Sequence, residues 1–191
     1  MNEVAGRIRR VVCDVVAEAV RASGAPGVRV LEDRTAEGEL LHAWLTGRLG
    51  EERVWRGGAL ASNVQGTAAA DSALLAHPAS RTALLLGGRP PHADLFPFGD
   101  VPAARLLDLA GGVSAAPEVE ALAQAAGLDA LDEALRRLLE ERDEPEYAVR
   151  DMDPAPGAEL LRLYERGRFF RRYPRLVPKL GGRTPGIDLF D

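Results

Sequence analysis

The first fifty residues carry the most regular hydrophobic pattern of the chain. Apolar residues recur at steps of three and four over residues 2–22, which predicts an amphipathic helix with one buried stripe. Gly24 ends this helix, and residues 28–31 form a short β-branched run that is typical of a buried strand. Thr35 is a candidate N-cap for a second helix that ends at Gly50. Helix, strand and helix in this order predict the start of an α/β sheet.

The middle of the chain repeats this alternation. Residues 53–55 form a weak strand pattern, residues 67–76 an alanine-rich helix pattern, and the apolar run 82–86 the strongest strand pattern of the chain. Asp100 is a candidate N-cap of a further helix that has Pro102 near its first position. Alternating strands and helices favour right-handed crossovers between parallel strands. We therefore expect an α/β fold with a three-layer, mostly parallel, doubly wound sheet.

The second half of the chain is helical in pattern. Two helices are predicted over residues 118–126 and 128–142, with a break at Gly127. A turn is expected at residues 153–157, followed by a short helix to Gly167 and then by extended or irregular chain. The sequence thus predicts a helical C-terminal part behind the α/β part.

Composition limits the class of protein. The chain has 191 residues, 46% of them hydrophobic and 28% charged, which is enough to form a core without a metal or a disulfide. We expect one domain over residues 1–191, with the basic segment 157–191 packed on it. Cys13 is the only cysteine, the N-terminus lacks a signal-peptide core, and no apolar stretch approaches the ~20 residues of a membrane span. These features predict a cytoplasmic protein with no membrane partner.

Positive charge is concentrated near the C-terminus. Residues 162–183 contain eight cations and one acid, whereas the whole chain has a net charge of −5. The candidate anion-binding residues are Arg168, Arg171, Arg172 and Lys179. Aromatic residues between these cations are typical of phosphate or nucleic-acid contacts. The alternative is that the aromatics pack on the domain and the arginines pair with its acids, and the acidic overall charge makes nucleic acid the less favoured partner.

Residues 82–111, TALLLGGRPPHADLFPFGDVPAARLLDLAG, resemble the middle of ammonia-dependent NAD synthetases and related N-type ATP pyrophosphatases. Residues 97–101 match the family phrase Pro-Leu-Gly-Asp-Leu, which begins a helix. The register extends back through residues 27–50, the family's first strand, loop and helix, and forward to LDALDEALRRLL and RRYPRLVPK. The resemblance implies an adenine nucleotide alpha hydrolase-like fold and a homodimer. In an active member it implies ligation of ammonia to deamido-NAD, with ATP and Mg²⁺ as cofactors.

The loop after the first strand departs from the family. There the family has Ser-Gly-Gly-x-Asp-Ser, which binds the pyrophosphate of ATP through backbone N–H groups and hydroxyls. This chain has instead Arg34, Thr35, Ala36, Glu37, Gly38 and Glu39. Acids at positions 32, 33, 37 and 39 would repel a triphosphate, since two like charges about 4 Å apart interact by about 4 kcal/mol at an effective dielectric of about 20. The lysine of the family phrase also falls at Ala103, which removes a cation that would stabilise phosphoryl charge.

Three functions stay open from the sequence. The first is a non-catalytic NAD-synthetase-like protein that has lost the ATP chemistry, and it binds a nucleotide-like ligand or a protein partner. No catalytic residue is assigned to it. The second is an active ATP-dependent amide ligase, and the third is a nucleic-acid-binding module that uses residues 162–183.

Further candidate ligand-binding residues follow the predicted strand 82–86, where open parallel sheets bind ligands. They are Gly87, Gly88, Arg89, Asp94 and Asp100. His92 and the two aspartates match no defined metal-site spacing, so no metal ligand is assigned. Cys13 lies on the apolar stripe of the first helix and is expected to be a buried apolar residue, and no pattern of a hydrolase triad is present.

Overall fold

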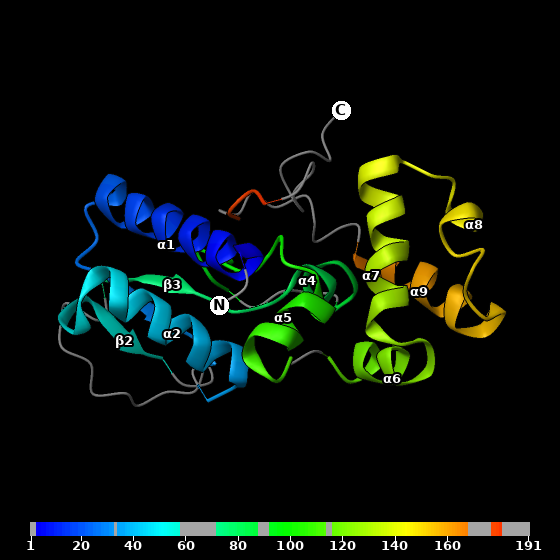
Figure 1. Cartoon of the computed structure of the whole chain (residues 1–191), viewed down its shortest axis with the longest axis horizontal. Coiled ribbons are helices and arrows are strands. Elements are labelled where there is room, and N and C mark those ends of the chain that lie inside the picture. Colours follow the sequence, from blue (N-terminus) through cyan, green and yellow to red (C-terminus); the bar gives the residue numbers. More distant parts are fainter. Residues whose placement is uncertain are drawn as a thin grey trace.

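A computed structural model of the whole chain describes residues 3–32, 34–57, 72–87, 92–113, 116–167 and 177–180. Figure 1 shows an α/β part, built from α1, α2 and the strands, beside a helical part that contains α6 to α9. The first helix, α1 (Glu3–Ser23), has the predicted buried stripe. None of the helices in these ranges combines the length and the apolarity that a membrane span requires.

The described strands form a small parallel sheet. β1 (Val28–Val30) lies between β2 (Val54–Arg56) and β3 (Leu74–Ala76), in the order β2-β1-β3. Both neighbours pair with β1 in parallel register. Leu95 extends the sheet past β3 through a parallel bridge to Ala76, and the His77 N–H donates to the Leu95 carbonyl at 3.0 Å. The predicted parallel α/β arrangement is therefore confirmed for this part of the chain.

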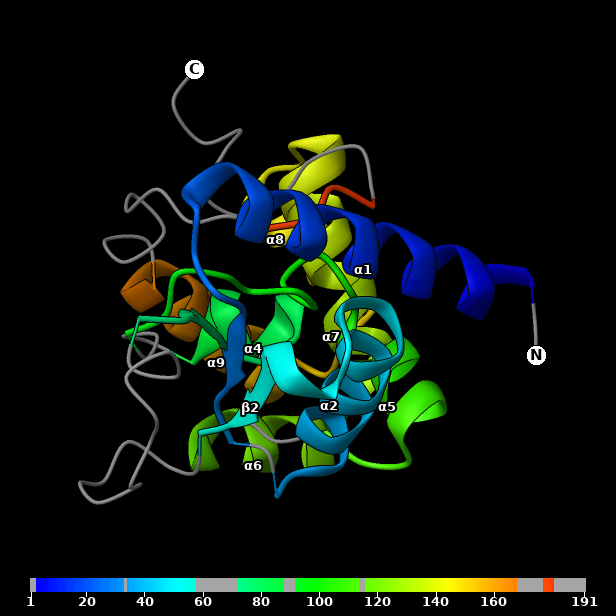
Figure 2. The same cartoon turned by 90° about the vertical axis from the view of Figure 1, so that its left-hand side faces the viewer.

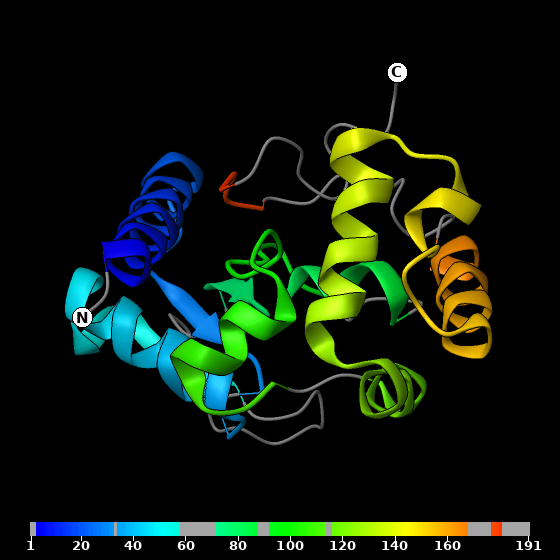
Figure 3. The same ribbon diagram turned by 45° about the vertical axis from the view of Figure 1, so that its right-hand side comes forward.

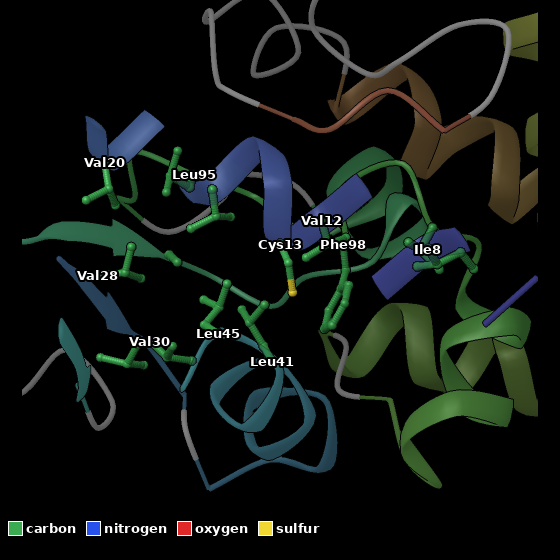
Figure 4. Packing of buried hydrophobic residues seen from close by; sticks show 14 of the residues in the cluster. Ile8, Val12, Cys13, Val20, Val28, Val30, Leu41, Leu45, Leu95 and Phe98 are labelled. Atoms are coloured by element: carbon green, nitrogen blue, oxygen red, sulfur yellow. The ribbon is translucent and has the colours of Figure 1, made fainter. Parts of the chain in front are cut away.

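One core joins the sheet to the helices α1 and α2 (Ala36–Leu49). Val28 and Val30 are fully buried and, two residues apart on one strand, project from the same face. Figure 4 shows these valines together with Leu41 and Leu45 of α2 and with apolar residues of α1. The short helix α5 (Ala103–Ala110) lies beside α2 (Figure 2), and a 3-10 turn, η1 (Glu51–Arg53), leads from α2 into β2. Residues 58–71, which join β2 to β3, lie outside the described ranges.

A second core holds the helical part together. It is formed by buried leucines and small residues of α4 (Arg81–Leu86), α6 (Pro117–Ala126), α7 (Leu128–Arg136) and α9 (Pro154–Gly167). Figure 3 shows α7 between the sheet and α9. The predicted break at Gly127 is confirmed, with a φ of 82° that favours glycine. After Arg136 the helix continues as a π-helical turn, η2 (Arg137–Glu141), and α8 (Pro145–Ala148) follows.

The predicted strand at residues 82–86 is wrong. This run forms the helix α4, whose N-cap Ser80 accepts a hydrogen bond from the Ala83 N–H at 3.2 Å. The strand is instead β3 at Leu74–Ala76, in the last part of the predicted helix 67–76, of which residues 67–71 lie outside the described ranges. Periodicity does not distinguish a buried strand from a buried helix when the apolar run is short. This explains why the strand and the helix were assigned to each other's positions.

Two predicted helix starts also need correction. Asp100 is not the cap of α5, because the carboxylate of Asp100 accepts from the Leu180 N–H at 2.6 Å. The first N–H groups of α5, at Ala103 and Ala104, donate to the distant Asp132 carboxylate at 3.2 and 2.8 Å. The predicted turn at 153–157 is mostly helix, since α9 begins at Pro154.

Candidate functional site

The candidate site lies at the carboxyl edge of the sheet, between the ends of β1 and β3. The chain leaves β1 through α2 toward β2, and it leaves β3 through residues 77–80 into α4. Connections that depart to opposite sides of a central strand open a crevice in which parallel α/β sheets bind ligands. The residues that follow these two strands are therefore the first candidates for binding.

Glu32 and His77 meet at this edge. Glu32 adopts a left-handed backbone conformation, with a φ of 49°, and its Oε1 lies 3.5 Å from Nε2 of His77. His77 is buried, and its Nδ1 accepts a hydrogen bond from the Ala79 N–H at 3.1 Å. In the neutral ring the proton is therefore on Nε2, which faces the carboxylate. The contact places the Glu32 carboxylate, held against the ring N–H of His77, at the end of the sheet.

The first turn of α2 has one of its N–H groups capped from within the chain. Thr35 is the N-cap, as predicted, and its Oγ1 accepts from the Gly38 N–H at 3.1 Å. The same hydroxyl donates to the Glu32 carbonyl at 2.8 Å. One of the N–H groups that a helix N-terminus could offer to an anion is thus already used inside the chain.

Negative charge surrounds the same turn. Glu37 is 3% exposed, whereas Glu39 and Arg34 are exposed to solvent. The segment after α5 also lies against this turn, because a Cβ added at Gly112 would lie 3.0 Å from the Cβ of Ala36. A buried carboxylate and a neighbouring backbone segment leave little room for a polyphosphate at the start of α2.

The structure does not bring the remaining predicted residues to this edge as one site. Gly87 follows the helix α4, not a strand, and its N–H donates to the Ala83 carbonyl at 2.9 Å. Asp94 stabilises β3, since its Oδ2 accepts a hydrogen bond from the Leu75 N–H at 2.8 Å. Lys179 is exposed in the short described stretch 177–180. The predicted residues that fall outside the described ranges are Gly88, Arg89, Arg168, Arg171 and Arg172.

Two features of this edge were missed by sequence reasoning. The Glu32–His77 contact depends on β1 and β3 being neighbours, which the misplaced strand concealed. Arg56 is exposed at the end of β2, in register with the last residue of β1. The signal that could have located His77 was Ser80, since a helix cap at that position ends the preceding strand near residue 76.

Other candidate chemistry is limited in the described residues. They contain no group of three or more histidine, cysteine, aspartate or glutamate side chains arranged to hold a metal ion. Cys13 is buried in the α1 stripe, as predicted, and burial raises the pKa of its thiol above the ordinary value. In the described part of the basic segment, Arg162 pairs with Glu159 and Arg166 with Glu118.

Comparison with known proteins identifies the fold. No family model matches the chain, and no curated protein matches its sequence. Among solved structures, the chain is similar to the NH3-dependent NAD synthetase from Campylobacter jejuni in complex with the nitrate ion. The similarity covers 92% of this chain and 99% of that chain, with a TM-score of 0.62 and 17% sequence identity. The chain therefore has an NAD-synthetase-like fold.

Proposed function

We propose that this chain uses its NAD-synthetase-like fold to bind a nucleotide-like ligand or a protein partner at the carboxyl edge of the sheet, and that it has lost the ATP chemistry of that family. The observation that supports the proposal best is the closed first turn of α2. Its Gly38 N–H is used by Thr35, and Glu37 is buried within it. A family that holds pyrophosphate at this turn needs free N–H groups and no buried acid there.

ATP and Mg²⁺ would be the cofactors of an active ligase, and the described residues do not fit ATP. A triphosphate at the start of α2 would approach a turn that carries the acids Glu37 and Glu39, and a like-charge contact at about 4 Å costs about 4 kcal/mol at an effective dielectric of about 20. Mg²⁺ could bridge carboxylate and phosphate, but it would not release the Gly38 N–H from Thr35. We derive no ATP-dependent step for this chain.

The Glu32–His77 pair favours a ligand with neutral polar groups. Nε2–H of His77 is directed at the Glu32 carboxylate 3.5 Å away, so the group that this pair offers to a ligand is the half-exposed carboxylate, an acceptor. The hydroxyls of a ribose or the amino group of a base can donate to it, whereas a phosphate would be repelled by Glu32. A nucleoside-like ligand with few phosphates therefore fits this edge better than a nucleoside triphosphate.

The wider organisation is part of the same proposal. It includes a three-layer, doubly wound sheet, one domain over residues 1–191 with the basic segment 157–191 packed on it, a homodimer and a cytoplasmic location. The ion pair of Arg166 with Glu118 of α6 supports packing of that segment rather than nucleic-acid binding.

The competing function is an active amide ligase that makes NAD from deamido-NAD, ammonia and ATP. The direct test is incubation of the purified protein with these three substrates and Mg²⁺, followed by measurement of NAD and AMP. We expect neither product above a no-enzyme control. Stoichiometric NAD and AMP over repeated turnovers would reject the proposal.

Ligand binding has its own readout. A ligand that binds only the folded state raises the midpoint of thermal unfolding. We expect adenosine or AMP to raise it more than ATP, because ATP brings more negative charge to Glu32 and Glu37. The matched variant Glu37→Gln removes one of these charges, and Glu3→Gln on α1 is its control. An ATP effect larger than that of adenosine in the unaltered protein would contradict the ligand assignment.

A further inference from the structure

An arginine-lined cavity lies between the α/β part and the helical part. Its volume is about 310 Å³, and its walls come from α1, α4, α5, α7, η2 and the short stretches at residues 100–102 and 180. The charged residues that line it are Arg7, Arg81, Arg105, Arg136, Asp100 and Glu140. The cavity contains neither the first turn of α2 nor the Glu32–His77 pair, so it is separate from the site proposed above.

Arg81 is the buried cation of this cavity. It is 4% exposed, and its Nη1 donates to Oε1 of Glu140 at 2.9 Å. Its Nε is buried without a hydrogen-bond partner in the described ranges. Buried donors are almost always satisfied, and an unsatisfied one in a cavity wall marks a place where a ligand oxygen would be held.

The π-helical turn η2 sets the position of the partner acid. Glu140 lies within this turn, and Arg136 is the last residue of α7 before it, so that the two side chains line the same cavity. Single π-helical turns are rare and occur frequently at functional sites. The helical register is therefore altered in the turn that supplies the partner of Arg81.

The lining itself carries more arginines than acids. Four arginines and two acids line the cavity, and of these acids Glu140 is paired with Arg81 while Asp100 accepts from the Leu180 N–H. Arg105 pairs with Asp108, and Arg136 pairs with Glu133 and Glu141, but the two arginine side chains remain 44% and 36% exposed. They can therefore turn toward an anion without desolvation of a buried ion pair.

The rest of the wall is apolar. Ile8 and Val101 are buried, and Val4, Pro102 and Leu180 complete the lining. A bare phosphate would leave these residues facing water, whereas an organic acid would cover them. We propose that this cavity binds a small organic carboxylate, with the acid group at Arg81 and the apolar body against Ile8, Val101 and Leu180.

The test uses the full chain and three probes: phenylacetate, its neutral isostere phenylacetamide, and inorganic phosphate. Binding is followed by the shift of amide resonances in a titration. We expect saturable binding of phenylacetate, at least about tenfold weaker binding of phenylacetamide, the factor that loss of one charged hydrogen bond implies, and weaker binding of phosphate. Equal affinity for acid and amide overturns the proposal, as does tighter binding of phosphate or no saturation with phenylacetate up to about 10 mM.

Two variants locate the site. Arg81→Gln combined with Glu140→Gln removes the buried guanidinium together with its partly exposed partner, so that neither charge is left unpaired, and phenylacetate binding should fall at least about tenfold. Arg105→Gln alters only a half-exposed residue, keeps the fold, and should weaken binding by a few fold. Arg48→Gln, an exposed position on α2, is the control and should have no effect. Unchanged phenylacetate affinity in Arg105→Gln and in the double variant would place the binding elsewhere and reject the proposal.

Discussion

The first backbone N–H groups of α2 and α5 find their hydrogen-bond acceptors in different places, one close in the sequence and the other far away. Thr35 caps α2 from the adjacent position in the sequence, with its Oγ1 3.1 Å from the Gly38 nitrogen. α5 begins after Pro102 without a side-chain cap of its own, and its first N–H groups donate to Asp132 on α7. Thr35, the local cap, stabilises only its own helix and uses the Gly38 N–H. Asp132, the remote cap, connects the α/β part to the helical part.

Loss of the remote cap should have the largest effect. Asp132 is 7% exposed and accepts hydrogen bonds from the Ala103 and Ala104 N–H groups and from the Thr82 hydroxyl. Asp132→Ala leaves these donors buried and should lower the free energy of unfolding by about 3 kcal/mol. Urea denaturation measures the change. Asp129→Ala, at an exposed position on the same helix, should lower the free energy of unfolding by only a few tenths of that amount. Equal effects of the two substitutions would refute a capping role for Asp132.

Asp100 is the cap of α5 that the sequence predicts, and a variant of Asp100 distinguishes this prediction from capping by Asp132. Its carboxylate accepts from the Leu180 N–H at 2.6 Å, so Asp100→Asn should lower the free energy of unfolding by about 2 kcal/mol. Hydrogen exchange should accelerate at Leu180 and stay unchanged at Ala103. The control is Asp108→Asn, at an exposed position of α5. Faster exchange at Ala103 would restore Asp100 as the cap of α5.

The two caps also show what sequence can predict. The amphipathic period of α1, Thr35 before α2 and the glycine after it are local signals, and each was interpreted correctly. Asp132 lies about 28 residues from the helix that it caps, and no spacing rule connects them. The nearer Asp100 was the only acid that a local rule could select.

The candidate sites were harder to predict for the same reason. The turn at residues 34–39 depends on residues adjacent in the sequence. Its departure from the family's Ser-Gly-Gly-x-Asp-Ser loop can therefore be recognised from the sequence alone. Glu32 and His77 meet because β1 and β3 are neighbours, and Arg81 meets Glu140 across 59 residues. Neither contact could be inferred while the apolar run 82–86 was interpreted as a strand.

The local cap should have a smaller effect than either aspartate. Thr35→Ala removes one hydrogen bond to the Gly38 N–H and should cost about 1 kcal/mol. Thr46→Ala, the same change in the last turn of α2, should be close to neutral because alanine favours helix. Thermal or urea unfolding of the two variants distinguishes them. A cost for Thr46→Ala equal to that for Thr35→Ala would show that capping is not the cause.

The smallest expected effect concerns pH and the helix α7 that carries the remote cap. Hydrogen bonds from Arg136 lower the pKa of Glu133 from its ordinary value of 4.5 to about 2. The carboxylate therefore stabilises the folded state above pH 4.5, and this contribution is lost as the pH falls toward 2. Because the Glu133 side chain is 43% exposed, solvent screens the pair, and Glu133→Gln should cost less than about 0.5 kcal/mol near neutral pH.

The measurement is urea denaturation of the unaltered protein and of Glu133→Gln at several pH values. The difference between them should shrink as the pH falls from 4.5 toward 2. Glu146→Gln, at an exposed position on α8, serves as the control. A difference that stays constant with pH would mean that the carboxylate charge of Glu133 does not contribute.

The most direct test of the central claim is a titration with ATP and Mg²⁺ in which the Gly38 amide resonance is observed. This N–H points at the Thr35 hydroxyl and is the donor that a pyrophosphate at the start of α2 would have to take. The account predicts that the resonance does not move as ATP is added. A saturable shift of Gly38, shared by its neighbours in residues 34–39, would contradict it.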